Sequence, residues 1–208
     1  MMHTTGEEQA RDQMSDEELI ERIAVVNPVW ARLMRTNPTV FERQPVPFYH
    51  RFQLLSATVS LEDRDMEFHY ADDGSRISIL RATPDYVYAV NQQESLRLDA
   101  KDIPAYLRFF FDNVTEPQIT IVESTDEVPW ISRVGSDPAL QALKEQASAK
   151  IQPMRVAVSG ADRFQVAATA MTGADLKELE LTVQRDGRVD VTNERVVVED
   201  LPVIESFS

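Results

Sequence analysis

The side chains of this sequence that could act together chemically are a histidine, three tyrosines and an arginine. His69 and Tyr70 lie in one segment of alternating apolar residues, and Tyr86 and Tyr88 lie in another, with Arg81 between them. Such alternation is typical of strands, in which alternate side chains share a sheet face. It favours packing of the tyrosines at a sheet edge. The alternative is a shallow pocket between sheet and helix, lined by these five ligand-binding candidates.

The sequence offers no recognisable catalytic or metal-binding pattern. It has no cysteine, which excludes disulfides, thiolate nucleophiles and cysteine-ligated metals. A hairpin turning near residues 62–63 would pair His69 with Ser56 rather than with His50, so a two-histidine metal site is not expected. Carboxylates cluster at predicted turns, where aspartate suits the backbone, although a carboxylate site assembled from several loops stays open. We predict no catalytic residue, no metal and no cofactor.

The charge balance limits the classes of partner. The 208 residues carry a net charge of −14, from 35 acidic and 21 basic side chains. This composition argues against binding nucleic acid through phosphates and against an anionic membrane surface. No apolar run reaches the ~18 residues of a membrane span, and the first residues lack the apolar stretch of a signal peptide. These features favour a soluble, cytoplasmic protein of bacterial type.

The densest aromatic run, residues 102–114, has the periodicity of an amphipathic helix. Asp102 is its expected N-cap, and Pro104 falls in the first turn, where a missing N–H costs least. Phe109 points away from the apolar face of this helix. We expect a neighbouring segment to cover its ring. A subunit or partner interface and a ligand contact are the alternatives.

The first ordered element is predicted to begin at Ser15, after a disordered arm over residues 1–14. Ser15 and Glu18 match the capping box of a helix start. An apolar stripe then continues through Pro28, which indicates either one kinked helix or two consecutive helices. Trp30 lies on this stripe, where it is expected to serve as core or as an interface residue.

The remaining pattern predicts an α+β fold. Alternation over residues 48–122 indicates an antiparallel meander, with a phase change at Leu54 that a β-bulge would explain. Helix 102–114 is expected to cover this meander. A connecting helix from Pro138, with Asp137 as its expected cap, then leads to a second antiparallel unit, in which Asp186-Gly187 predicts a hairpin turn. The predicted organisation is the arm, one unit over residues 15–134, and another over residues 135–208 that packs on the first.

These observations favour a non-catalytic binding or adaptor protein that contacts itself or a protein partner through residues 15–34 or Phe109. The first alternative is a small-molecule-binding protein or enzyme that uses the tyrosine pocket. A component of a larger assembly is the second alternative.

Overall fold

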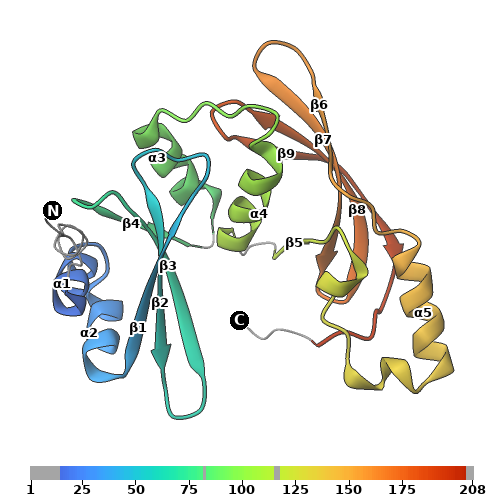
Figure 1. The fold of residues 1–208 in the computed structure, drawn as a ribbon, viewed down its shortest axis with the longest axis horizontal. Coiled ribbons are helices and arrows are strands. Elements are labelled where there is room, and N and C mark those ends of the chain that lie inside the picture. The colour runs from blue at the N-terminus through green and yellow to red at the C-terminus, as the bar shows by residue number, and fades with distance from the viewer. Residues whose placement is uncertain (1–14, 82, 115–117, 205–208) are drawn as a thin grey trace, which may run out of the picture. The chain divides into compact units, whose positions relative to one another are not determined.

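The computed structural model describes residues 15–81, 83–114 and 118–204, so the predicted arm over residues 1–14 lies outside the described residues. The predicted α+β class is confirmed, with two antiparallel sheets (Figure 1). Internal contacts divide the chain into unit 1, which comprises Met1–Pro45 and Phe52–Ile79, and unit 2, which comprises Val46–Arg51 and Leu80–Ser208. Unit 2 therefore includes the 46–51 loop as well as the chain from Leu80 on. The boundary that the sequence predicts at residue 135 remains a prediction.

Unit 1 begins with two short helices, α1 (Asp16–Val26) and α2 (Pro28–Thr36). The predicted capping box is present, since the Ser15 hydroxyl accepts from the Glu18 N–H and the Glu18 carboxylate accepts from the Ser15 N–H. Asn27 ends α1 and caps α2, because its side-chain oxygen accepts from the Trp30 N–H at 3.1 Å. Pro28 therefore opens a second helix, where its missing N–H costs little.

The sheet of unit 1 has the order β1-β2-β3-β4, and its strands are β1 (Thr39–Pro45), β2 (Gln53–Ser60), β3 (Asp65–Asp72) and β4 (Ile77–Leu80). Ser56 pairs with His69, as predicted. Strand β1 ends at Pro45, and an edge strand tolerates proline. Residues 48–51 lie outside the strands, so the phase change at Leu54 marks the start of β2 and not a bulge.

The helices α1 and α2 pack on this sheet and form the core of unit 1. Ile23 and Ala31 are fully buried against strand residues that include Leu55 and Tyr70. The Trp30 ring lies 4.3 Å from the Phe68 ring. The cover of this sheet within unit 1 is therefore the N-terminal helix pair. The predicted cover, helix 102–114, belongs to unit 2.

A buried carboxylate connects three elements of unit 1. Asp72, whose side chain is 3% exposed, lies 2.5 Å from Arg22 Nη2 of α1 and 3.3 Å from Arg43 Nη2 of β1. It also accepts from the Gly74 N–H at 2.9 Å, within the β3–β4 turn. Asp72 thus forms ion pairs with two guanidinium groups and shapes the hairpin turn that follows it.

Unit 2 contains three α-helices among its described residues: α3 (Pro84–Glu94), α4 (Ile103–Asn113) and α5 (Pro138–Ser148). The helices at Ile103 and Pro138 match the sequence prediction, and Asp137 caps α5 as expected. The prediction of a strand over residues 86–90 is wrong, because this segment is the helix α3. Two 3-10 turns, Thr125–Glu127 and Ser132–Gly135, lead into α5.

The sheet of unit 2 has the order β5-β7-β8-β9, and β6 also pairs with β7. Its strands are β5 (Thr120–Ile121), β6 (Arg155–Val158), β7 (Arg163–Thr172), β8 (Asp175–Gln184) and β9 (Val189–Val198). Leu181 and Val166 pair across β7 and β8 and are both buried. Figure 1 shows β7, β8 and β9 as long strands joined by tight turns.

The structure identifies what covers Phe109 in α4. Its side chain is 8% exposed, and the ring lies 5.4 Å from Phe48 and 5.6 Å from Tyr49, both in the loop segment of unit 2. The expectation that a neighbouring segment wraps this flank is therefore confirmed. Phe109 does not present an exposed ring for an interface.

Among the described residues, no helix combines the length and the apolar composition that crossing a bilayer requires.

Candidate functional site

The five predicted ligand-binding residues do not share a sheet face. His69 and Tyr70 are neighbours on β3, so their side chains point to opposite faces. Tyr70 is fully buried in the core of unit 1. Tyr86 and Tyr88 lie on α3, and Arg81 lies in the connection before that helix.

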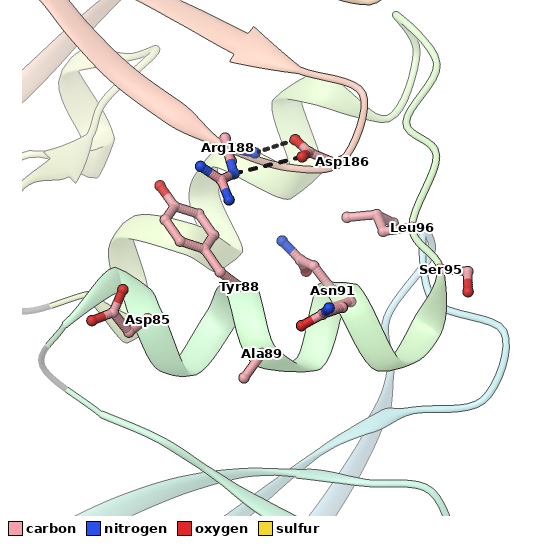
Figure 2. Close-up of a pocket in the computed structure, with 9 residues that line it drawn as sticks. Asp85, Tyr88, Ala89, Asn91, Ser95, Leu96, Asp186 and Arg188 are labelled. Carbon is pink, nitrogen blue, oxygen red and sulfur yellow. Dashed lines mark hydrogen bonds and ion pairs between the residues drawn. The ribbon is translucent and has the colours of Figure 1, made fainter.

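Of these five residues, Tyr88 lines a pocket in unit 2. The pocket has a volume of about 510 Å³ and lies between α3, the turn after it, and the β8–β9 turn (Figure 2). Asp85 and Asn91 contribute from α3, and Asp186 and Arg188 contribute from the turn. Arg188 Nε lies 3.6 Å from the Asp186 carboxylate, which Figure 2 marks with a dashed line. Charged side chains of both signs line the opening.

A chain of buried hydrogen bonds passes through Asn91 of this pocket. The Tyr49 hydroxyl donates to Asn91 Oδ1 at 2.5 Å, and Asn91 Nδ2 donates to the Tyr106 hydroxyl at 2.8 Å. The Tyr106 hydroxyl then donates to the Gly187 carbonyl at 2.5 Å. The chain therefore connects the 46–51 loop, α3, α4 and the β8–β9 turn.

Gly187 lets the β8–β9 turn lie this close to Asn91 and Tyr106. Its φ is +86°, and an added Cβ would collide with Asn91 Nδ2 and lie 2.6 Å from the Tyr106 hydroxyl. The predicted Asp186-Gly187 hairpin turn is thus present, and glycine is needed there both for the backbone angle and for space.

Burial determines the protonation of these phenols. Desolvation raises the pKa of Tyr49 and of Tyr88, and it raises the pKa of Tyr106 well above its ordinary value. All three hydroxyls therefore remain neutral near pH 7. Because their pKa values are raised in the folded state, these tyrosines make their full contribution to the free energy of unfolding below about pH 10, the ordinary pKa of tyrosine. This contribution is lost as the pH rises further.

A second tyrosine in a core contrasts with Tyr106. The Tyr70 hydroxyl is buried and has no hydrogen-bond partner among the described residues. Desolvation by its apolar surroundings raises the pKa of Tyr70. Tyr106 is thus a buried phenol with hydrogen-bond partners, whereas Tyr70 is a buried phenol without one among the described residues.

We expect Tyr106→Phe to lower the free energy of unfolding by about 1.5 kcal/mol, because the Gly187 carbonyl and Asn91 lose a partner. We expect Tyr70→Phe to leave stability unchanged or to raise it by up to about 1 kcal/mol, because a desolvated hydroxyl is removed without loss of a bond. Urea unfolding followed by circular dichroism measures both. Equal losses in the two variants would contradict this assignment.

Strand β9, which follows the pocket residue Arg188, forms an open edge of the sheet as far as the described residues show. β9 pairs with β8 on one side, and residues 190–196 are all exposed. Val191 and Val196 are 44% and 40% exposed. The strand carries register shifts opposite Glu180 and near its C-terminal end, as β-bulges produce. Edge strands present backbone groups to which another chain can bind.

The Tyr88 hydroxyl bonds to the backbone of Val189, the first residue of this edge. Its hydroxyl accepts from the Val189 N–H at 3.1 Å and donates to the Val189 carbonyl at 3.3 Å. These are the two backbone groups that a neighbouring strand would otherwise bind. Beyond Val189, the exposed part of the edge begins. Sequence reasoning named Tyr88, but no local signal links it to a residue 101 positions away.

The described residues contain no cluster of three histidine or carboxylate side chains that could hold a metal ion. Comparison with protein-family models, with curated proteins and with solved structures finds no match to this chain. The geometry of the pocket and of the β9 edge is therefore the basis for a functional proposal.

Proposed function

We propose that this chain is a non-catalytic protein-binding module whose binding site is the open edge of β9. In this mode an extended segment of a partner adds to the sheet as a further strand and bonds to the free backbone groups of the edge. The observation that carries the proposal is the run of seven exposed residues, 190–196, in a ten-residue strand. The cytoplasmic setting expected from the sequence is part of the same proposal.

The contrast within β9 supports this site. At Val189 the edge is already bonded to the Tyr88 hydroxyl, whereas Val191 lies two residues further along. In an antiparallel ladder, residues two apart direct their backbone groups to the same side. The N–H and carbonyl of Val191 therefore point outward, as those of Val189 do. Its exposed side chain adds apolar area next to these groups.

The test uses displayed heptapeptides selected on the immobilised full-length chain. Val191→Pro removes an outward N–H and no bond to β8, because the inward groups belong to the neighbouring residues. We expect the selected peptides to bind wild type and the matched control Val191→Thr alike, and to bind Val191→Pro at least about tenfold more weakly. Absence of selected peptides, or equal binding to all three proteins, would refute the β9 site.

The second candidate is a small-molecule function at the pocket of about 510 Å³. The observation that favours it is that Arg188, Asp85 and Tyr88 all line this one pocket. A thermal-shift screen of zwitterionic metabolites, repeated with Arg188→Ala, tests it. Stabilisation of the wild type that Arg188→Ala abolishes would support the pocket. A role as a component of a larger assembly would use the same edge of β9.

A further inference from the structure

We infer that the segment that adds to β9 is β9 of a second copy of this chain, in an antiparallel pair with its two-fold axis between Thr192 and Asn193. This inference rests on the proposed function of the β9 edge and names its partner. It follows from two properties of the strand, namely the side to which each residue directs its backbone and the positions of its charges.

The first property is the phase of the backbone. Val189 is directed outward, as its bonds to Tyr88 show, so Val191 is outward and Asp190 is inward. The register skips Thr192, because Leu181 pairs with Val191 and Glu180 pairs with Asn193. After this bulge the outward positions are Glu194 and Val196.

The bulge at Thr192 allows β9 to pair with β9 of a second copy. Opposite residues in an antiparallel pair must both face the partner or both face away. With the axis between Thr192 and Asn193, outward Val191 lies opposite outward Glu194 of the second copy. Inward Asp190 then lies opposite inward Arg195. Without the one-residue bulge, this register would place outward residues opposite inward ones.

The second property is the charge pattern. The same register places Asp190 of each copy opposite Arg195 of the other, which forms two ion pairs across the axis. Asp190 is exposed, and the Arg195 side chain is 69% exposed while it contacts Glu178 of β8. Registers centred on Asp190 or on Arg195 also preserve the backbone phase. They place two aspartates or two arginines opposite each other, and like charges in that position are unfavourable.

Tyr88 limits the length of the pair. Because its hydroxyl already bonds to Val189, the ladder runs from Asp190 to Arg195 in each copy. So short a ladder buries less than the roughly 1,600 Å² of a standard interface, so we expect a weak dimer with a Kd on the order of 10–100 μM.

The experiment is sedimentation velocity of the full chain over a concentration series up to about tenfold above this Kd range. We expect wild type and Val191→Thr to dimerise, and Val191→Pro to lose at least about tenfold in association. Asp190→Arg alone places arginines opposite each other, and Arg195→Asp alone places aspartates opposite each other. Each single variant is therefore expected to associate at least about tenfold more weakly with itself.

An equimolar mixture of the two single variants gives the sharpest result. In a heterodimer of Asp190→Arg with Arg195→Asp, every opposed pair again has unlike charges, so we expect the mixture to regain association. Circular dichroism confirms that each variant is folded. A monomeric wild type, a dimer that tolerates Val191→Pro, or a mixture that stays monomeric would overturn the inference.

The proposed function is tested separately by the displayed peptides. Peptide binding that depends on Val191, together with a monomeric wild type, would reject the second copy as partner and retain β9 as a binding edge. Absence of both activities would reject both proposals.

Discussion

Gly187→Ala is expected to lower the free energy of unfolding by about 3–4 kcal/mol, from about 1 kcal/mol for a non-glycine residue at positive φ and the remainder from a collision. The φ of Gly187 is +86°, and the new Cβ would meet Asn91 Nδ2 and the Tyr106 hydroxyl. Both groups belong to the buried hydrogen-bond chain, so relief of the collision breaks at least one of its bonds. Trp130 fluorescence in a Trp30→Phe background reports unfolding of unit 2.

Gly173→Ala provides the matched control. Gly173 lies in the β7–β8 turn of the same sheet and has a φ of +58°. Apart from its two chain neighbours, no described residue has an atom within 4 Å of an added Cβ. Its cost is expected to be about 1 kcal/mol, the backbone contribution alone. The difference between the two variants isolates the collision. Equal decreases in the free energy of unfolding would contradict this assignment, because they would show that the β8–β9 turn can move away from the helices without a loss of stability.

The elements that the sequence predicted well are those whose signals are local. The capping box at Ser15, the Asp137 cap and the Asp186-Gly187 turn each depend on residues within four positions of one another. Such signals operate through the same backbone groups in any tertiary context.

The misassigned helix α3 has an equally clear physical reason. Tyr86, Tyr88 and Val90 alternate as strand residues do, and this alternation outweighed Pro84, which opens the helix. The buried face of α3 consists of Val87, Val90 and Asn91, so its helical periodicity is short and includes a polar residue. Asn91 is buried because Tyr49 and Tyr106 bond to it, and no local pattern contains that information.

The candidate site itself depends on distant pairings. The cover of Phe109 comes from Phe48 and Tyr49, about 60 residues earlier, in a segment whose alternation resembled a strand. An edge strand and a central strand have similar sequences, because exposure depends on which strands pair. The open edge of β9 therefore became recognisable only from the sheet order.

Asp72→Ala is expected to lower the free energy of unfolding by about 3 kcal/mol, at the lower end of the range for breaking a buried ion pair. The carboxylate is 3% exposed, whereas the side chains of Arg22 and Arg43 are 19% and 30% exposed. Its removal leaves two guanidinium groups with less compensating charge in a partly desolvated place. Their residual contact with water keeps the loss from being larger. Trp30 fluorescence in a Trp130→Phe background measures it.

The surface pair Arg35–Glu21 separates burial from proximity. Its atoms lie 2.5 Å apart, as do those of Arg22 and Asp72, but its side chains are 44% and 64% exposed. Glu21→Ala is therefore expected to change stability by less than about 0.5 kcal/mol, because water and salt screen an exposed pair. Similar losses in Glu21→Ala and Asp72→Ala would mean that distance, and not desolvation, sets the energy of both pairs.

Asp72→Asn separates the effect of the Asp72 charge from the effect of its hydrogen bond in the β3–β4 turn. The amide oxygen can still accept from the Gly74 N–H, so the hairpin bond is kept while the negative charge between Arg22 and Arg43 is lost. If the charge dominates, Asp72→Asn approaches the loss of Asp72→Ala. If the turn dominates, it stays close to wild type. We expect the first outcome, because an uncompensated buried charge costs more than one backbone hydrogen bond, which is worth about 1 kcal/mol.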